Sequence, residues 1–416
     1  MKKQFLVTIL VVGVSSALVL AQQSISHLPT GNGVPHRKLR VVLYPFIPEF
    51  VAAAEQIKLQ FEAENPNVDL EILDLRSNYY GPSDPNYVGN TDADVYELDS
   101  VFLQDFVDSN KIREMPGAAL LPPKDLLRNA DDGSQIGGKR YGAAHWVCRD
   151  FLFYSLANKP KSDIRTLADL QAFIRPDGLL LVDLKGKSTL GELYLISAFD
   201  RYSDWSLVAP KIDTFDPSIG DDEAQVLKLC NAASCRDQIF HELTGIHGAE
   251  FARKRGKALI GYSELLHDVL AETQNCPGAC LSDKEIEVSD LPLDNVGSTP
   301  VSWVDSFVIN ANCKGQHLAD AVRFIRMMNT DEMYVKLLLP GPPSFLHVPE
   351  PADPVPSYLL PAKASLYSNP DLRRVAHLYP QMKLLVENAK APTSHDLNKK
   401  LRTIGGTIDK NLGTSP

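Results

Sequence analysis

Strand and helix signals alternate from residue 38 onward. The run KLRVV at 38–42 is β-branched and precedes a Tyr-Pro pair, where a strand gives way to a loop. Residues 50–64 carry apolar side chains at helical spacing and stop before an Asn-Pro pair, and residues 68–75 alternate as a strand. Strand–helix–strand order implies parallel pairing through right-handed crossovers, so the sequence predicts an α/β fold.

The same alternation continues to the end of the chain. Strands are expected within 93–100, 178–184, 258–263 and 300–310, and helices within 101–110, 166–174, 191–202, 317–340 and 373–389. Thr166 followed by Asp169 is a favourable helix start. Ligands in such sheets bind beyond the carboxyl ends of strands, which we place after Leu43, Val95 and Ile260.

The N-terminus has the pattern of an export signal. Two lysines precede an apolar run, and small residues precede Gln22, so residues 1–21 are expected to be a cleaved signal peptide. An uncleaved membrane anchor is the alternative. No later segment is long and apolar enough to span a bilayer. The mature protein is therefore expected to be secreted or periplasmic, with about 395 residues, enough for two domains.

The net charge of the chain limits the classes of molecule that it is expected to bind. Its formal net charge is -10 and it has no basic run, which argues against a nucleic-acid surface. An acidic protein also fits a site for a cationic small molecule. We expect no metal, no cofactor and a monomer.

The six cysteines suit an oxidising compartment, where most should pair. Cys230/Cys235 and Cys276/Cys280 form two local pairs, each of which closes a tight loop or pairs with the other. A zinc site from these four is disfavoured by their irregular spacing. Cys148 remains with Cys313, and a bridge between those two requires a contact that the sequence does not show.

Four segments resemble, in their order, the type II periplasmic solute-binding proteins: FEAENPNVDLEI, DADVYELDSVFLQDFVDSNKIREM, GKRYGAAHWVCRDFLFYSLA and TLADLQAF. The resemblance implies two α/β domains with a ligand cleft between them. We expect the first domain at 38–145 and 300–345, the second at 146–299, and a C-terminal helical segment at 346–416 that packs on both.

A cysteine in the cleft departs from ordinary solute-binding proteins. CRDFLFY (148–154) and GYSE (261–264), in this order, resemble the exported type I thiaminases, as do YELD (96–99) and SWVDSF (302–307). Trp303 and Phe46 stand where that family usually has tyrosines. The resemblance implies that Cys148 attacks the pyrimidine of thiamine and that Glu264 accepts the thiol proton. The thiazole then leaves, and an amine, a thiol or water replaces it.

The residue types agree with this chemistry. A thiolate adds to electron-poor carbons, and a Glu shares its proton usefully near neutral pH when burial raises the pKa of the carboxyl. Carboxylates accept from an aminopyrimidine, and aromatic rings stack on a flat cation. The expected substrate-binding residues are Tyr44, Asp94, Asp99, Tyr262, Trp303 and Asp305.

Each assignment has a structural alternative. Cys148 could be a core residue, Glu264 could stabilise a helix start, and Asp99 could cap the helix that follows it. Tyr44 and Trp303 could simply pack. His145 and His267 are left out, because a lone histidine is more often satisfied structurally.

The sequence therefore supports two functions. The first is a thiamine-degrading transferase that acts on thiamine and a nucleophilic co-substrate. The second is a non-catalytic extracytoplasmic binding protein for thiamine or another small organic ligand. A papain-like hydrolase lacks support, because no histidine motif accompanies Cys148.

Overall fold

The computed structural model describes residues 36–76, 79–81, 87–160, 162–175, 180–182, 187–227, 246–340 and 354–413 of the chain. The expected signal peptide therefore lies outside the described residues, as do Cys230 and Cys235. Residues from His36 onward form one compact unit. Among the described residues, no helix has both the length and the hydropathy needed to cross a membrane.

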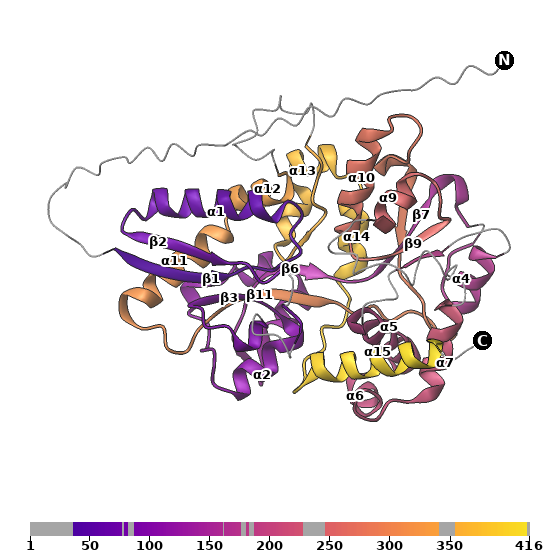
Figure 1. The fold of residues 1–416 in the computed structure, drawn as a ribbon, viewed down its shortest axis with the longest axis horizontal. Coiled ribbons are helices and arrows are strands. Elements are labelled where there is room, and N and C mark those ends of the chain that lie inside the picture. The colour runs from indigo at the N-terminus through magenta and orange to yellow at the C-terminus, as the bar shows by residue number, and fades with distance from the viewer. Residues whose placement is uncertain are drawn as a thin grey trace, which may run out of the picture. The chain divides into compact units, whose positions relative to one another are not determined.

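A six-stranded mixed sheet forms one half of this unit (Figure 1). In spatial order its strands are β12 (Leu360–Pro361), β6 (Ala143–Cys148), β11 (Trp303–Ile309), β3 (Val95–Asp99), β1 (Arg37–Val42) and β2 (Val68–Leu73). The strands β2, β1 and β3 are parallel, as the sequence predicts, whereas β11 is antiparallel to both of its neighbours. The carboxyl end of β3 is Asp99, so the expected strand end after Val95 was wrong by four residues.

Helices cover this larger sheet. They are α1 (Phe50–Glu64), α2 (Leu103–Asp108), α3 (Arg128–Gly133), α11 (Gly315–Met328) and α12 (Asp331–Leu338). Helix α1 packs on β2 through Ile57 and Phe61, both fully buried, and also contacts α11 and α12. Its end at Asn65 is where the sequence places it.

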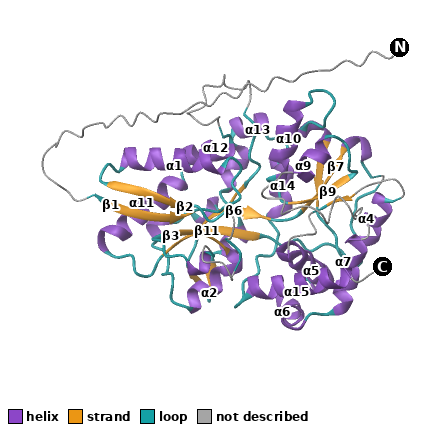
Figure 2. Ribbon diagram, viewed as in Figure 1, coloured by secondary structure: helices purple, strands orange, loops and turns teal. Residues whose placement is uncertain are grey.

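A four-stranded sheet forms the other half (Figure 2). Its order is β10 (Ile286–Ser289), β7 (Phe151–Ser155), β9 (Ala258–Gly261) and β8 (Leu180–Leu181). The helices around it are α4 (Leu167–Ile174), α5 (Lys187–Tyr202), α6 (Trp205–Thr214), α7 (Pro217–Leu227), α9 (Ile246–Ala252) and α10 (Leu265–Asn275). Helix α4 begins with the expected capping box of Thr166 and Asp169.

The C-terminal segment reaches both sheets. Strand β12 pairs with β6 and is followed by α13 (Pro370–Val375), α14 (Tyr379–Val386) and α15 (Leu397–Gly413). Helix α15 lies within the C-terminal segment that the sequence predicts to be helical, although its bounds were not predicted. This helix lies against α5 so closely that a Cβ at Gly191 would collide with the backbone of Leu401, which explains the glycine.

The chain crosses from the larger sheet to the smaller one directly after Cys148. Only Arg149 and Asp150 separate β6 from β7, and Phe151 pairs at once with Gly261 of β9. Arg149 is buried, and its guanidinium lies 2.9 Å from the Asp290 carboxylate and 4.8 Å from the centre of the Phe151 ring. This crossover brings the end of β6 and the end of β9 together.

Candidate active site

Cross-strand pairing places Cys148 on the same face of the sheet as two aspartates. Cys148 pairs with Trp303, and Asp305 pairs with Asp99 on its other side. Directly opposed residues in an antiparallel pair point to the same face, as do residues two apart. A register shift between Asp305 and Ser306 leaves His145 as an extra residue in β6, and such a bulge redirects the side chains beside it.

The Cys148 thiol is in direct contact with one of these aspartates. Its Sγ atom donates to Asp305 Oδ2 at 3.1 Å and lies 4.0 Å from the Tyr44 hydroxyl oxygen. Cys148 is free, so the possible bridge to Cys313 does not form. All three side chains are buried, so the contact is shielded from bulk solvent.

Tyr44 links the thiol to Glu264. The Tyr44 hydroxyl donates to Glu264 Oε1 at 3.3 Å, and the Ser263 hydroxyl contacts Oε2 at 3.4 Å. Glu264 stands at the start of α10, yet its side chain does not cap that helix. The half-buried carboxylate instead accepts from the hydroxyl groups of Tyr44 and Ser263.

Asp99 anchors an aromatic wall. Its Oδ2 accepts from the Tyr80 hydroxyl at 2.7 Å, and its Oδ1 accepts from the Val101 amide at 2.9 Å. The helix-capping role that the sequence left open is therefore present together with the tyrosine contact. The Tyr80 ring stacks on Phe46 at 5.9 Å, and Phe46 meets Tyr44 edge-on at 5.4 Å.

The electrostatics of this cluster disfavour a thiolate in the unliganded protein. Burial raises the pKa of Cys148 well above its usual value, and the nearby Asp305 and Glu264 raise it further. Burial also raises the pKa of Asp305 well above its normal range, and the charge of the nearby Asp99 raises it further. Burial raises the pKa of Asp99 to about 6. A positive charge in this place would favour the ionised form of all three groups.

Asp305 also keeps one free acceptor. Its Oδ1 atom is buried and has no hydrogen-bond partner among the described residues. A buried acceptor without a partner costs about 1–3 kcal/mol of stability, which a donor on a ligand would recover.

Tyr262 and Trp303 flank the thiol from the two sheets. Trp303 opposes Cys148 in the β11–β6 register and is buried. Tyr262 follows the end of β9, and its hydroxyl donates to the Glu192 carboxylate of α5. The structure thus brings together seven of the eight residues singled out from the sequence: Tyr44, Asp99, Cys148, Tyr262, Glu264, Trp303 and Asp305.

Asp94 lies elsewhere. It precedes β3, whereas Asp99 ends it, so the two carboxylates are separated by the length of the strand. Asp94 Oδ2 accepts from the Arg40 amide at 2.8 Å, and its Oδ1 is 3.4 Å from Cys313 Sγ and 3.7 Å from His317 Nδ1.

Sequence reasoning missed Glu97. Its Oε2 accepts from the Tyr44 amide at 2.7 Å, and its Oε1 lies 2.5 Å from Nδ1 of the buried His145. Glu97 therefore holds the loop that carries Tyr44, and His145 acts through it. The signal was available, because Glu97 and Asp99 are two residues apart and must share a face of β3.

Two groups among the described residues have metal-like geometry, and both lie outside this cluster. In the first, Glu272 with Cys276 and Cys280, the two cysteines form a disulfide, one of the pairings expected from the sequence. The second is Asp105, His395 and Asp396, at the surface beside α2.

No protein-family model matches the chain. Thiaminase-1 of Paenibacillus thiaminolyticus is 24% identical over 401 residues, which span 87% of this chain and 90% of that protein.

Solved structures with a similar fold come from two groups. Clostridium botulinum thiaminase I in complex with thiamin has a TM-score of 0.73 at 20% identity, covering 90% of this chain and 100% of that one. A eukaryotic thiaminase-I bound to 3-deazathiamin has a TM-score of 0.65 at 16% identity, covering 90% and 99%. A solute-binding protein of an ABC transporter from Agrobacterium radiobacter K84, in complex with ribitol, has a TM-score of 0.67 at 12% identity, covering 92% and 96%.

These findings confirm the fold class expected from the sequence: the chain has the α/β fold of the two-domain periplasmic solute-binding proteins. Within that class, the chain is similar in sequence and in fold to thiaminase I.

Proposed function

We propose that this protein is a thiamine-degrading transferase that exchanges the thiazole of thiamine for another nucleophile through an adduct on Cys148. The observation that carries the proposal is the 3.1 Å contact of the Cys148 thiol with Asp305, at a sheet edge where Tyr44 and Glu264 also converge. A cleft that only holds a ligand gains nothing from a reactive thiol in an oxidising compartment.

Cation binding is the step that activates the thiol. Burial raises the pKa of the Cys148 thiol, and the acidic neighbours Asp305 and Glu264 raise it further. Thiamine carries a thiazolium cation and an aminopyrimidine that is readily protonated. A positive charge placed between Asp99, Asp305 and Cys148 lowers the pKa of the thiol and ionises it when substrate is present.

Glu264 receives the proton through Tyr44. The Tyr44 hydroxyl lies 4.0 Å from Cys148 Sγ and 3.3 Å from Glu264 Oε1, so one hydroxyl spans the gap between acid and base. Apo distances of this kind shorten when a substrate closes the site. Asp305, with its free Oδ1, holds the amino group of the pyrimidine.

The covalent chemistry takes place in two steps. The thiolate electron pair forms a C–S bond to the pyrimidine half, and the bond to the thiazolium nitrogen breaks. Its electron pair leaves on that nitrogen, so the thiazole departs neutral. Glu264 releases the thiol proton to solvent before the second step. The incoming amine, thiol or water then replaces the sulfur and gives its own proton to the carboxylate, which returns it to the Cys148 thiolate.

The organisation of the chain belongs to the same proposal. Residues 1–21 direct export, which places the protein in the periplasm or outside the cell. The domains comprise 38–145 with 300–345, and 146–299, and residues 346–416 bridge them. The contacts of β12 with the larger sheet and of α15 with α5 support this arrangement.

Trapping the adduct tests the proposal. Full-length protein is incubated with thiamine without an added nucleophile, and intact mass spectrometry and peptide mapping follow. We expect the pyrimidine half on the peptide that contains Cys148, and its release when an aromatic amine is added. The Cys148→Ser variant should bind thiamine without forming an adduct.

A different outcome would favour the second function. Thiamine that binds and is recovered unchanged with every amine and thiol co-substrate would identify a binding protein. An adduct on a residue other than Cys148 would overturn the assignment of the nucleophile while keeping the reaction.

A further inference from the structure

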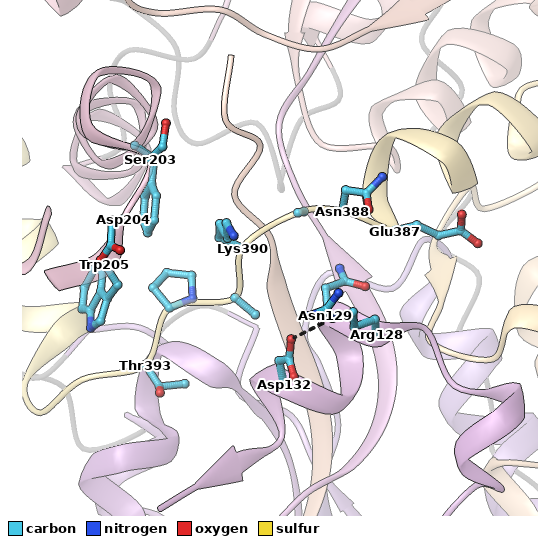
Figure 3. Close-up of a pocket in the computed structure, with 14 residues that line it drawn as sticks. Arg128, Asn129, Asp132, Ser203, Asp204, Trp205, Glu387, Asn388, Lys390 and Thr393 are labelled. Atoms are coloured by element: carbon cyan, nitrogen blue, oxygen red, sulfur yellow. Dashed lines mark ion pairs between the residues drawn. The ribbon is translucent and has the colours of Figure 1, made fainter. Parts of the chain in front are cut away.

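A second pocket lies on the other face of β11. Its volume is about 560 Å³, within the range of small-molecule sites. Figure 3 shows its walls: α3 with Asn129, the start of α6 with Trp205, and the segment 387–393 between them. The pocket therefore touches both halves of the protein and the C-terminal segment that links them.

Strand alternation separates this pocket from the cysteine site. Helix α3 packs on the face of β11 that carries Val304, because a Cβ at Gly133 would collide with the Val304 side chain. Neighbouring residues in a strand point to opposite faces, so Trp303 and Asp305 face away from α3. Nothing that occupies the pocket needs to leave the cysteine site for thiamine to bind.

Asn129 is a buried residue of the pocket wall. Asn129 is 1% exposed, and its amide donates to the Ser302 hydroxyl at 3.0 Å. Its Oδ1 atom is buried and has no hydrogen-bond partner among the described residues. Because this oxygen has almost no accessible surface, Asn129 shapes the wall and leaves contacts with a ligand to the other lining residues.

The charges around the pocket are compensated. Arg128 lies 4.0 Å from Asp132, and Lys383 lies 3.1 Å from Glu387. The Ser206 hydroxyl and amide lower the pKa of Asp204, and Lys390 contributes in the same direction. The lining thus has polar groups of every kind but no excess charge to attract an ion.

One flat apolar surface completes the lining. Trp205 is partly exposed at the pocket and is held by stacking on Phe199, with the ring centres 5.9 Å apart and the planes at 13°. Ser203, Asn388 and Thr393 add neutral donors and acceptors to the pocket lining. A sugar ring has the matching surface, since its C–H face packs on an aromatic ring and its hydroxyls both donate and accept.

We propose that this pocket binds a neutral, polyhydroxylated ligand, a mono- or disaccharide, with its ring on Trp205. The proposal is independent of the thiamine chemistry, because it depends on a different face of β11. Occupation of the pocket ties α3 to α6 and thereby joins the two halves of the protein.

Calorimetric titration of the full chain with D-glucose and with sucrose tests this proposal. We expect binding of at least one of them, with a Kd of about 1 mM or tighter. Trp205→Ala should weaken it at least tenfold, whereas Trp205→Phe, which keeps a ring, should weaken it severalfold less. Leu207→Ala is the matched control, because Leu207 lies on the same helix, is 53% exposed and does not line the pocket.

The competing outcomes are distinguishable. Saturating thiamine added to Cys148→Ser should leave sugar binding unchanged, and displacement by thiamine would place the sugar in the cysteine site and overturn the proposal. It also fails if neither sugar binds, or if Trp205→Ala binds as wild type does. A thermal unfolding midpoint for Trp205→Ala close to that of wild type shows that the variant is folded.

Discussion

Two free cysteines with an aspartate beside each invite comparison. Cys148 Sγ lies 3.1 Å from Asp305 and Cys313 Sγ lies 3.4 Å from Asp94, and both cysteines are buried. Burial raises the pKa of both thiols, that of Cys313 to about 12. They occupy opposite ends of the same strands. Cys148 lies where β1, β3 and β9 end, and Cys313 lies where β3 begins.

The surroundings of the two thiols differ. Around Cys148 are the Tyr44 hydroxyl, an unpaired Asp305 oxygen and a further carboxylate on Glu264. Around Cys313 the aspartate is already engaged by the Arg40 amide, and among the described residues no second acid contacts the thiol. A cysteine–aspartate contact is thus not itself a reactive site. At Cys148, the further groups that a reaction requires come from several strands that end at the same place.

The largest effect should come from exchanging each thiol for a hydroxyl. Cys148→Ser should lower the rate of thiamine loss with an aromatic amine by about 10³-fold or more, because the nucleophile is removed. Cys313→Ser should leave that rate unchanged. Equal losses in the two variants would mean that both thiols act through folding, and unfolding midpoints would then differ from wild type.

The next largest effect distinguishes the general base, Glu264, from the hydroxyl that relays the proton, Tyr44. Glu264→Gln should slow adduct formation on Cys148 by about 10²-fold or more while thiamine still binds, since a general base contributes on this scale. Tyr44→Phe should slow it less, because water can replace a relay hydroxyl. Rapid-quench mass spectrometry gives the rates, and an undiminished rate in Glu264→Gln would refute the base role.

The two aspartates provide a matched pair. Asp305→Asn should weaken thiamine binding about tenfold, because it removes a charge from the site while preserving its shape. Asp94→Asn should leave the Kd unchanged, since Asp94 is at the other end of β3. Titration calorimetry measures the Kd for thiamine, and both substitutions are made in Cys148→Ser protein so that thiamine is not turned over. Weaker binding in Asp94→Asn would restore it as a site residue.

The smallest effect is on stability. Burial raises the pKa of Asp99 from 3.8 to about 6, so the folded protein binds a proton that the unfolded chain releases. Stability is therefore lost as the pH rises from about 4 through 6, by about 2–3 kcal/mol. Asp99→Asn should raise the unfolding midpoint at pH 7.5 by a few degrees and change it less at pH 4.

Asp216 serves as the control of opposite sign. Its pKa is lowered to about 2, chiefly by the hydrogen bond from Lys211, so its stabilisation is present above pH 3.8 and lost as the pH falls through 2. Asp216→Asn should lower the midpoint at pH 7.5. If Asp99→Asn also lowers the unfolding midpoint at pH 7.5, the ionised Asp99 carboxylate does not destabilise the folded protein.

Local patterns predicted most of the elements and most of the site residues, but not the contacts between distant segments. Helix α1 and its stop at Asn65 follow from apolar spacing and a proline, and the α4 capping box from Thr166 and Asp169. The packing of α15 on α5 was not predicted, because the two helices are distant in sequence. Glu97 was missed because its partner His145 is 48 residues away.

The sequence by itself determined the α/β class, the resemblance to thiaminases and most of the side chains that meet at the site, because these depend on periodicity and on short motifs. Only the tertiary structure decided which end of each strand matters. Asp94 and Asp99 look alike in the sequence, and the register of β3 with β11 alone places Asp99 opposite Asp305. Register is a property of two segments, and neither carries it alone.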